Sequence, residues 1–216
     1  MGKNGTGKNN LIIIGGRANT KIAKNIIKNK YNEVYYYADR EYNENEFKKE
    51  GFICINSFNE VIDIITLGSD YFVGIGGTDL RRAFTEKITN LTGVRPINII
   101  SPLAIIEKGV TMGKGNLILH KALININTRV GSNNIFNTGC IVEHDNVIGD
   151  YNHIAPGSIT GGYVKIGNNN NIFIGSTILP FLKITNNITI AGCSTLTKSI
   201  NISGTYMGTP AKIVSK

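Results

Sequence analysis

Hydrophobic positions divide the sequence into two parts with different periods. In the first part, residues 11–29 and 71–88 each run from a short apolar stretch through glycines into a segment with apolar residues at helical spacing. Two further strands are expected at 33–40 and 97–100. This alternation predicts an α/β unit with a small Rossmann-like parallel sheet covered by helices, which binds ligands at the carboxyl ends of its strands.

In the second part an apolar position returns every six residues. Steps of six from Met112 reach Ile118, Ile124, Val130, Phe136, Val142, Ile148, Ile154, Thr160, Ile166, Ile172, Ile178, Ile184, Ile190 and Leu196. All of these are apolar except Thr160. A helix repeats at 3.6 residues and a simple strand at 2, so neither keeps this period. The repeat predicts a parallel β-helix of about five coils over 112–200, with three six-residue units per coil and the apolar row inside.

Small residues recur at fixed places between the apolar positions. Glycine often follows the apolar position directly, as at Gly113, Gly131, Gly149, Gly161 and Gly167, and asparagine or another small residue often lies four positions after it. We expect both sets at the corners, where a positive φ is needed. Hexapeptide coils are left-handed, against the usual crossover rule. The predicted organisation is a leader at 1–10, an α/β domain at 11–100, and a left-handed parallel β-helix with a C-terminal extension at 101–216.

Composition narrows the class of protein. Hydrophobic residues make up 41% and charged residues 18%, which suits a folded domain, and 25 glycines with no tryptophan suit one rich in turns. The net charge of +8 favours anionic partners such as nucleotides, but the charges are spread out and no nucleic-acid-binding module is present. No apolar run is long enough for a membrane span and no signal peptide begins the chain, so we expect a cytoplasmic protein with no membrane partner. The three cysteines are expected to be small buried residues.

Several segments together are similar to a known family. They are "NTG-x-x-VEHD" at 137–145, "IGDYNHIAPGS" at 148–158, "GTPAKIV" at 208–214, the glycine turn of "IIIGG" and "VGIG" leading to Arg81. Over residues 11–214 the sequence resembles the hexapeptide-repeat acyltransferases, and within them the sialic acid O-acetyltransferases and nucleotide 4-amino-sugar N-acetyltransferases.

The resemblance assigns roles in the β-helix. It implies that His144 is the general base, that Asp145 raises its basicity, and that His153, Ile174 and Gly192 line an acetyl-CoA site. This agrees with the chemistry of imidazole, which can take a proton from an amine or hydroxyl near neutral pH while a carboxylate stabilises the imidazolium. Spacing leaves open whether Glu143 or Asp145 contacts the ring. His120 is isolated, so no metal site is expected.

The resemblance also implies that the amino-terminal unit holds the nucleotide of a sugar substrate. The residues assigned to that site are Gly15, Gly16, Arg17, Asp39, Arg40 and Gly76. The chain departs from the family on this side: "GGRANT" replaces a turn that often reads Gly-x-x-Gly-His-Gly, and Arg40 replaces a second acidic residue. Arg17 and Arg40 are either phosphate contacts or solvated surface charges. The nucleotide and the sugar therefore stay open.

Spacing makes further predictions about the active site. His144 and His153 are nine residues apart, one and a half repeats, so they should lie on different sides of the β-helix. A cyclic homotrimer with active sites between subunits would bring two such sides together. Asn137 is a candidate for orienting the acceptor. Gly162 should lie one coil from His144, and its N–H could stabilise an oxyanion. Cys140 is close enough in sequence to suggest an acyl-enzyme, but we expect it to point inward.

These observations favour one function and leave two alternatives. The favoured function is an acetyl-CoA-dependent N-acetyltransferase that acts on the 4-amino group of a nucleotide-linked (UDP, dTDP or GDP) deoxy sugar in bacterial surface-glycan biosynthesis. One alternative is O-acetylation of sialic acid or a related sugar by the same fold. The other is a binding or scaffold β-helix without catalysis.

Overall fold

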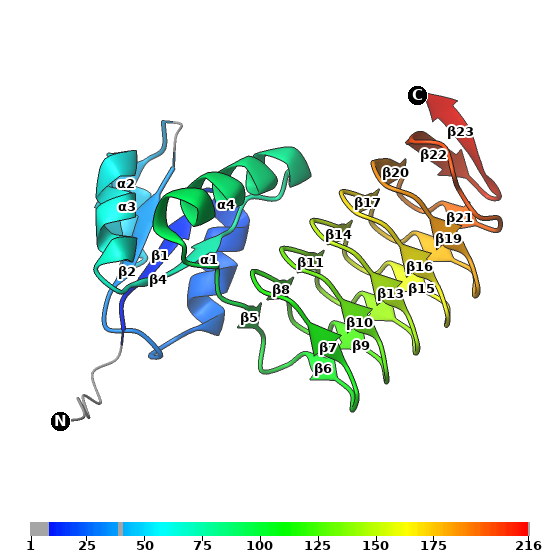
Figure 1. Ribbon diagram of the computed structural model, residues 1–216, viewed down its shortest axis with the longest axis horizontal. Helices are drawn as coiled ribbons and strands as arrows, with labels where there is room; N and C mark the ends of the chain where they lie inside the picture. The colour runs from blue at the N-terminus through cyan, green and yellow to red at the C-terminus, as the bar shows by residue number, and fades with distance from the viewer. Residues whose placement is uncertain (1–8, 39–40, 216) are drawn as a thin grey trace. The chain divides into compact units, whose positions relative to one another are not determined.

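A computed structural model describes residues 9–38 and 41–215 of the 216-residue chain (Figure 1). Most of the predicted leader and the two substrate-site residues Asp39 and Arg40 lie outside the described residues. The chain divides into two compact units. The first runs up to Ile75 and includes Ala83–Ile99, and the second comprises Gly76–Arg82 and the chain from Ile100 onward. The short segment 76–82, predicted within the first domain, thus groups with the second unit.

The first unit contains a four-stranded parallel sheet with the strand order β3-β2-β1-β4. Its strands are β1 (Leu11–Ile14), β2 (Val34–Tyr37), β3 (Ile53–Ile55) and β4 (Asp70–Val73), and the helices of the chain are α1 (Arg17–Ile26), α2 (Glu44–Lys49), α3 (Phe58–Thr66) and α4 (Thr78–Thr92). All four residues of the central strand β1 are fully buried. A parallel strand covered on both faces has an unbroken apolar sequence, which is why "LIII" shows no alternation. The predicted Rossmann-like parallel sheet is confirmed.

The apolar run at 97–100 belongs to a different sheet from the one its position suggested. The strand β5 (Ile99–Ile100) is the edge strand of an eight-stranded sheet in the β-helix, where it neighbours β8. Ile97 bonds back to the first sheet, through its N–H to the carbonyl of Tyr71 at 2.9 Å. A short apolar run predicts a strand but does not specify its partner, so the sequence could not place it.

The second unit is a left-handed parallel β-helix with three sheets (Figure 1). One side holds β7 (Thr111–Met112), β10 (Arg129–Val130), β13 (Val147–Ile148), β16 (Lys165–Ile166) and β19 (Lys183–Ile184). The second side holds β6 (Ile105–Ile106), β9 (Leu123–Ile124), β12 (Ile141–Val142), β15 (Ile159–Thr160), β18 (Thr177–Ile178) and β21 (Thr195–Leu196). The third side holds β5, β8 (Leu117–Ile118), β11 (Ile135–Phe136), β14 (His153–Ile154), β17 (Asn171–Ile172) and β20 (Ile188–Ile190), and ends with the hairpin of β22 (Gly204–Gly208) and β23 (Ala211–Ser215).

The coils stack in the register that the six-residue period predicts. Val130 pairs with Ile148 of a neighbouring coil, and Phe136 pairs in the same way with Ile154. The predicted inward positions from Ile118 to Leu196 are all buried, including the polar Thr160. Met112, in the first coils, is partly exposed. Three hexads per coil and an internal aliphatic row are therefore confirmed.

The corners, defined here as the turns between two sides, differ from the prediction. Positive φ falls three residues after the inward position, at residues such as Asn127, Asp145 and Tyr163, and not at the glycines that follow it directly. Those glycines are required by close stacking, since a Cβ on Gly131 would lie 2.2 Å from Asp150 Oδ1 and 2.7 Å from the carbonyl oxygen of Gly149. The asparagines four positions after the inward residue are buried inside.

The three cysteines differ in their exposure. Cys140 is buried, Cys54 is partly buried, and Cys193 is exposed at a corner with φ 55°. The expectation that all three are buried is therefore wrong for Cys193, because a corner residue with positive φ points away from the core.

Across residues 9–38 and 41–215, no helix has the length and apolar character that a membrane crossing requires.

Candidate active site

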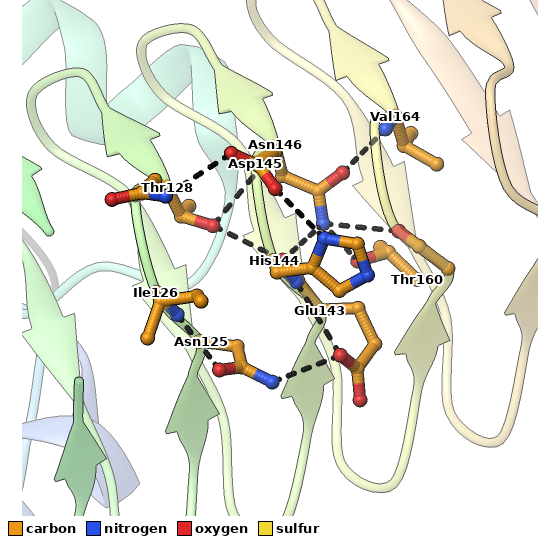
Figure 2. Close-up of polar contacts among 11 residues, drawn as sticks. Asn125, Ile126, Thr128, Glu143, His144, Asp145, Asn146, Thr160 and Val164 are labelled. Carbon is orange, nitrogen blue, oxygen red and sulfur yellow. Dashed lines mark hydrogen bonds and ion pairs between the residues drawn. The ribbon is translucent and has the colours of Figure 1, made fainter. Parts of the chain in front are cut away.

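His144 and Asp145 form a hydrogen-bonded pair at a corner of the β-helix (Figure 2). His144 lies in the turn after β12, and Asp145 follows with φ 56°, a conformation that aspartate tolerates better than most residues. This backbone turns the carboxylate back, so that Oδ2 lies 2.8 Å from Nδ1 of the imidazole. The hydrogen bond from His144 holds the pKa of Asp145 below its ordinary value.

The geometry of this pair leaves one imidazole nitrogen available. An ionised carboxylate can only accept a hydrogen bond, so Nδ1 donates to it and Nε2 carries the lone pair. The side chain of His144 is 43% exposed, and its ring lies perpendicular to the ring of Tyr163 at a centroid distance of 5.3 Å. His144 can therefore accept a proton from a group in solution.

Glu143, the other carboxylate beside His144, does not contact the ring. Its Oε2 accepts hydrogen bonds from Asn125 Nδ2 at 2.9 Å and from the backbone N–H of His144 at 3.4 Å. The structure therefore answers the question that spacing left open: Asp145 orients the imidazole, and Glu143 holds the backbone of the turn.

Gly162 lies against the imidazole in the next coil. A Cβ on Gly162 would come within 2.7 Å of both Cε1 and Nε2 of His144, so a larger residue here would displace the imidazole. Its N–H has no hydrogen-bond partner among the described residues. At the equivalent place in the two preceding coils, the N–H groups of Ile126 and His144 are bonded to the side chains of Asn125 and Glu143.

The sequence explains why this N–H is open. Gly162 follows Gly161, which has no side chain to accept a hydrogen bond, and the next coil carries Pro180, which has no N–H at all. In this row of the β-helix, an unpaired N–H next to the imidazole therefore occurs at Gly162. The predicted position of Gly162, one coil from His144, is confirmed.

His153 lies on another side of the β-helix, in β14, as the nine-residue spacing predicted. Its Nε2 is 3.3 Å from Nδ2 of Asn137. Burial lowers the pKa of His153 to about 4, and the positive charge of Arg81 contributes to the shift. His153 is therefore neutral at neutral pH. The structure groups Asn137 with His153 and not with His144, and its role in orienting the acceptor stays a prediction.

Arg81 is a buried residue to which sequence reasoning gave no role. Its side chain is 1% exposed and donates to four backbone carbonyls: Gly76 at 2.7 Å, Asn133 at 3.0 Å, Tyr151 at 3.2 Å and Asn152 at 3.4 Å. Burial lowers the pKa of its guanidinium to about 10. Arg81 anchors the segment Gly76–Arg82 to the coils that carry His153. An arginine in the first turn of a helix gives no sequence signal for such an anchor.

Two residues predicted to line the acetyl-CoA site lie side by side in successive coils. A Cβ on Gly192 would lie 3.3 Å from Cγ2 and from the carbonyl oxygen of Ile174. The side chain of Ile174 is 58% exposed. Both follow strands of the side that carries His153. They are compatible with an apolar contact to a ligand, and their assignment to acetyl-CoA stays a prediction.

The residues predicted to bind a nucleotide are only partly described. Gly15 and Gly16 form the turn between β1 and α1 with φ 67° and 66°, and a Cβ on Gly16 would overlap the carbonyl of Gly74. Gly16 is therefore required by backbone packing alone. The side chain of Arg17 lies outside the described part of the structure, as do Asp39 and Arg40. Gly76 accepts the hydrogen bond from Arg81 and belongs to the second unit.

Two other chemistries suggested by residue types find no support. The thiol of Cys140 is buried in the core, and burial raises its pKa to about 12, which opposes formation of a nucleophilic thiolate. His120 contacts Ser101 through Nδ1 at 2.6 Å. Within the described part of the chain, no group of three or more His, Cys, Asp or Glu residues could hold a metal ion.

The fold is that of the hexapeptide-repeat acetyltransferases. The chain is similar to PerB from Caulobacter crescentus, solved with CoA and GDP-perosamine, at 23% identity and a TM-score of 0.86 over 95% of this chain and 97% of that one. It is also similar to the acetyltransferase domain of PglB from Neisseria gonorrhoeae, solved with acetyl coenzyme A, at 24% identity and a TM-score of 0.86 over 96% and 100% of the two chains.

A third solved structure, WeeI from Acinetobacter baumannii, matches at 19% identity and a TM-score of 0.70 over 94% of this chain and 99% of that one. No protein-family model matches the sequence, and no curated protein is detectably similar to it. At these identities the likeness shows the fold, so the activity rests on the site.

Proposed function

We propose that the protein is an acetyl-CoA-dependent N-acetyltransferase that acts on the 4-amino group of a nucleotide-linked deoxy sugar. The observation that carries this proposal is the arrangement at one corner: the His144 imidazole, oriented by Asp145, lies against Gly162, whose N–H has no partner among the described residues. A proton acceptor next to an unpaired backbone donor is what acyl transfer requires.

The residues would act as follows. The sugar amine attacks the thioester carbonyl carbon of acetyl-CoA, and Nε2 of His144 takes the proton that the amine loses. Asp145 stabilises the imidazolium, and the N–H of Gly162 donates to the carbonyl oxygen as it becomes negative. The C–S bond then breaks, the proton on His144 passes to the departing thiolate, and the products are the N-acetyl sugar and CoA. No covalent acyl-enzyme is involved, which agrees with the buried thiol of Cys140.

The acceptor is inferred from the first unit and from the proteins of the same fold. A parallel sheet with a glycine turn before α1 is a common frame for a nucleotide. PerB was solved with GDP-perosamine, a nucleotide-linked amino sugar. We infer a substrate of the same class here. We place the reaction in the cytoplasm, on the route to a bacterial surface glycan such as a lipopolysaccharide O-antigen.

We further propose that the active protein is a homotrimer. His144 and His153 lie on different sides of one β-helix, so a site that uses both needs a second copy. The side that carries β12 presents an aliphatic row outward, in which Ile105 is 53% and Ile159 is 39% exposed in the single chain. A ring of three copies would cover such a row and place His153 of one copy near His144 of the next.

The test is a thiol-release assay with acetyl-CoA and a panel of acceptors: UDP-, dTDP- and GDP-linked 4-amino sugars and sialic acid. We expect turnover on one amino sugar, and a fall of about 10²- to 10⁴-fold in His144→Ala, the range of general-base catalysis. The control is Asn168→Ala, at the matching place of another corner, where the side chain only accepts a hydrogen bond from the backbone of Asp150.

Each outcome has a definite meaning. Turnover on sialic acid alone would replace the proposal with O-acetylation. Turnover that His144→Ala does not reduce would remove His144 from the mechanism. Absence of turnover together with absence of acetyl-CoA binding would favour a non-catalytic β-helix.

A further inference from the structure

A group of buried polar side chains interrupts the aliphatic interior beneath the candidate active site. Thr160 breaks the apolar row of the β-helix, and it is fully buried. Thr128 and Asn146 are also buried, at 0% and 1% exposure. Burial of a hydroxyl in place of a methyl costs free energy unless the hydroxyl is hydrogen-bonded, so the buried hydroxyl of Thr160 requires a hydrogen-bond partner.

That partner is the side-chain amide of Asn146. Its Nδ2 donates to the carbonyl of Glu143 at 2.7 Å, to Oγ1 of Thr160 at 2.9 Å and to the carbonyl of Gly161 at 3.1 Å. Its Oδ1 accepts the backbone N–H of Val164. Figure 2 shows this amide between the turn that carries His144 and the coil that follows it.

The bond to Gly161 fixes the direction of the candidate oxyanion donor. The Gly161 carbonyl and the Gly162 N–H belong to one peptide unit, which is planar and trans, so the two groups point in opposite directions. Because Asn146 holds the carbonyl toward the interior, the N–H points outward, where the imidazole lies. A peptide between two glycines has little conformational preference of its own, so it depends on such a contact for its orientation.

The bond to Glu143 ties the same amide to the base. The Glu143 carbonyl belongs to the peptide unit that carries the N–H of His144, and it also accepts a hydrogen bond from Oγ1 of Thr128 at 3.0 Å. One buried amide therefore contacts both peptide units whose relative position defines the site.

We propose that Asn146, supported by Thr160, is a positioning residue that sets the Gly162 N–H against the His144 imidazole. This inference rests on the proposed function of that corner. Asn146 contacts no reacting atom, so its effect on the reaction passes through the two peptides.

A matched amide exists in the same fold. Asn116 is also fully buried, donates to the Gly131 carbonyl at 2.9 Å and accepts the N–H of Asn134 at 2.9 Å. It therefore braces one coil against the next, as Asn146 does, at a corner without His144. Serine at such positions makes the same contact, since Oγ of Ser158 donates to the Phe173 carbonyl and Oγ of Ser176 to the Ala191 carbonyl. Alanine, which cannot donate, is accommodated at the equivalent position of another coil by Ala122, which is fully buried.

The experiment compares Asn146→Ala with Asn116→Ala in the full chain, because alanine has no donor for the carbonyl fifteen residues ahead. We expect Asn146→Ala to lower kcat about 10- to 100-fold, because a small misplacement at the reacting centre has an effect of this size, while the KM for acetyl-CoA changes less than about twofold. Asn116→Ala should lose a similar amount of thermal stability and keep kcat. Asn146→Val, which copies the buried residue found one coil later at Val164, serves as a second variant if the alanine protein does not fold.

A kcat equal to that of the wild type in both alanine variants would overturn the proposal and leave Asn146 a brace like Asn116. An equal fall of kcat in both would overturn it as well, because the loss would follow stability and not position.

A crystal structure of Asn146→Ala separates this inference from the proposed function. We expect the Gly161–Gly162 peptide to be rotated or to occupy two orientations, whatever reaction the protein catalyses. An unchanged peptide would overturn the inference even if the acetyltransferase activity is established. A rotated peptide in a protein without acetyltransferase activity would keep the positioning role and discard the function.

Discussion

The two histidines of the β-helix have the same side chain and opposite surroundings. His144 is 43% exposed and its Nδ1 is held by the carboxylate of Asp145. His153 is largely buried, lies near the guanidinium of Arg81, and has a pKa lowered to about 4. Burial beside a cation opposes protonation of His153, whereas the carboxylate of Asp145 fixes the orientation of the His144 ring.

The different surroundings of His144 and His153 suit them to different roles. His144 is placed to take up a proton and hold the resulting charge. His153 is kept neutral, so that it can donate and accept hydrogen bonds without changing its charge over the working pH range. Different surroundings of two like side chains are a common basis for distinct roles in one site.

The largest effect should come from removing the charge beside His144. Asp145→Asn keeps the size of the side chain and tolerates a positive φ. It removes the charge that stabilises the imidazolium, and its amide can donate to Nδ1, which places the proton on Nε2. We expect kcat/KM to fall about a thousandfold. Glu143→Gln is the matched control, because Glu143 contacts the backbone and not the ring. Equal losses in both variants, measured by thiol release, would contradict the assignment.

An intermediate effect should appear in the pH dependence of stability. Between pH 6.5 and about 4 the unfolded chain binds a proton at His153 that the folded protein does not bind. The free energy of unfolding should therefore decrease as the pH falls through this window, by up to about 3 kcal/mol. Urea unfolding of the wild type and of His153→Gln at several pH values measures it. The variant should lack this part of the decrease, and parallel curves would show that His153 is not kept neutral.

The smallest effect should come from the cation beside His153. Arg81→Gln removes a positive charge that lowers the pKa of His153, so that pKa should rise, by less than about one unit because burial is the larger cause. An NMR titration of the His153 ring in the folded protein measures this, and Arg81→Lys, which keeps a charge, should shift it less. A pKa that stays constant or falls in Arg81→Gln would show that the guanidinium does not act on His153.

The sequence predicted the structure best where the same burial requirement repeats along the chain. The row from Ile118 to Leu196 predicted the coils, their register and their interior, because each coil must bury the same position. The same period placed Gly162 one coil from His144 and separated His144 from His153. The unbroken apolar run of β1 predicted a buried parallel strand for a similar reason.

What the sequence could not supply depends on contacts within and between coils. The choice of Asp145 over Glu143 depends on a backbone angle at one corner, and the glycines after the inward row serve stacking and not positive φ. Arg81 also bonds to the carbonyls of Asn133, Tyr151 and Asn152, which are far away in sequence. The exception at Thr160 was visible in the pattern, but its meaning appeared only with the amide of Asn146 opposite it.

The close stacking of the glycines that follow the inward row has a consequence for how this chain can change. Because a Cβ on Gly113, Gly131, Gly149 or Gly167 would meet the coil beyond it, intolerance to substitution should run as a stripe along the axis of the β-helix. The outward residues between such stripes meet no such obstacle. An exhaustive substitution map of this protein would therefore show lines with a period of one coil, and a break in a line would mark a place where the chain serves its reaction instead of its fold.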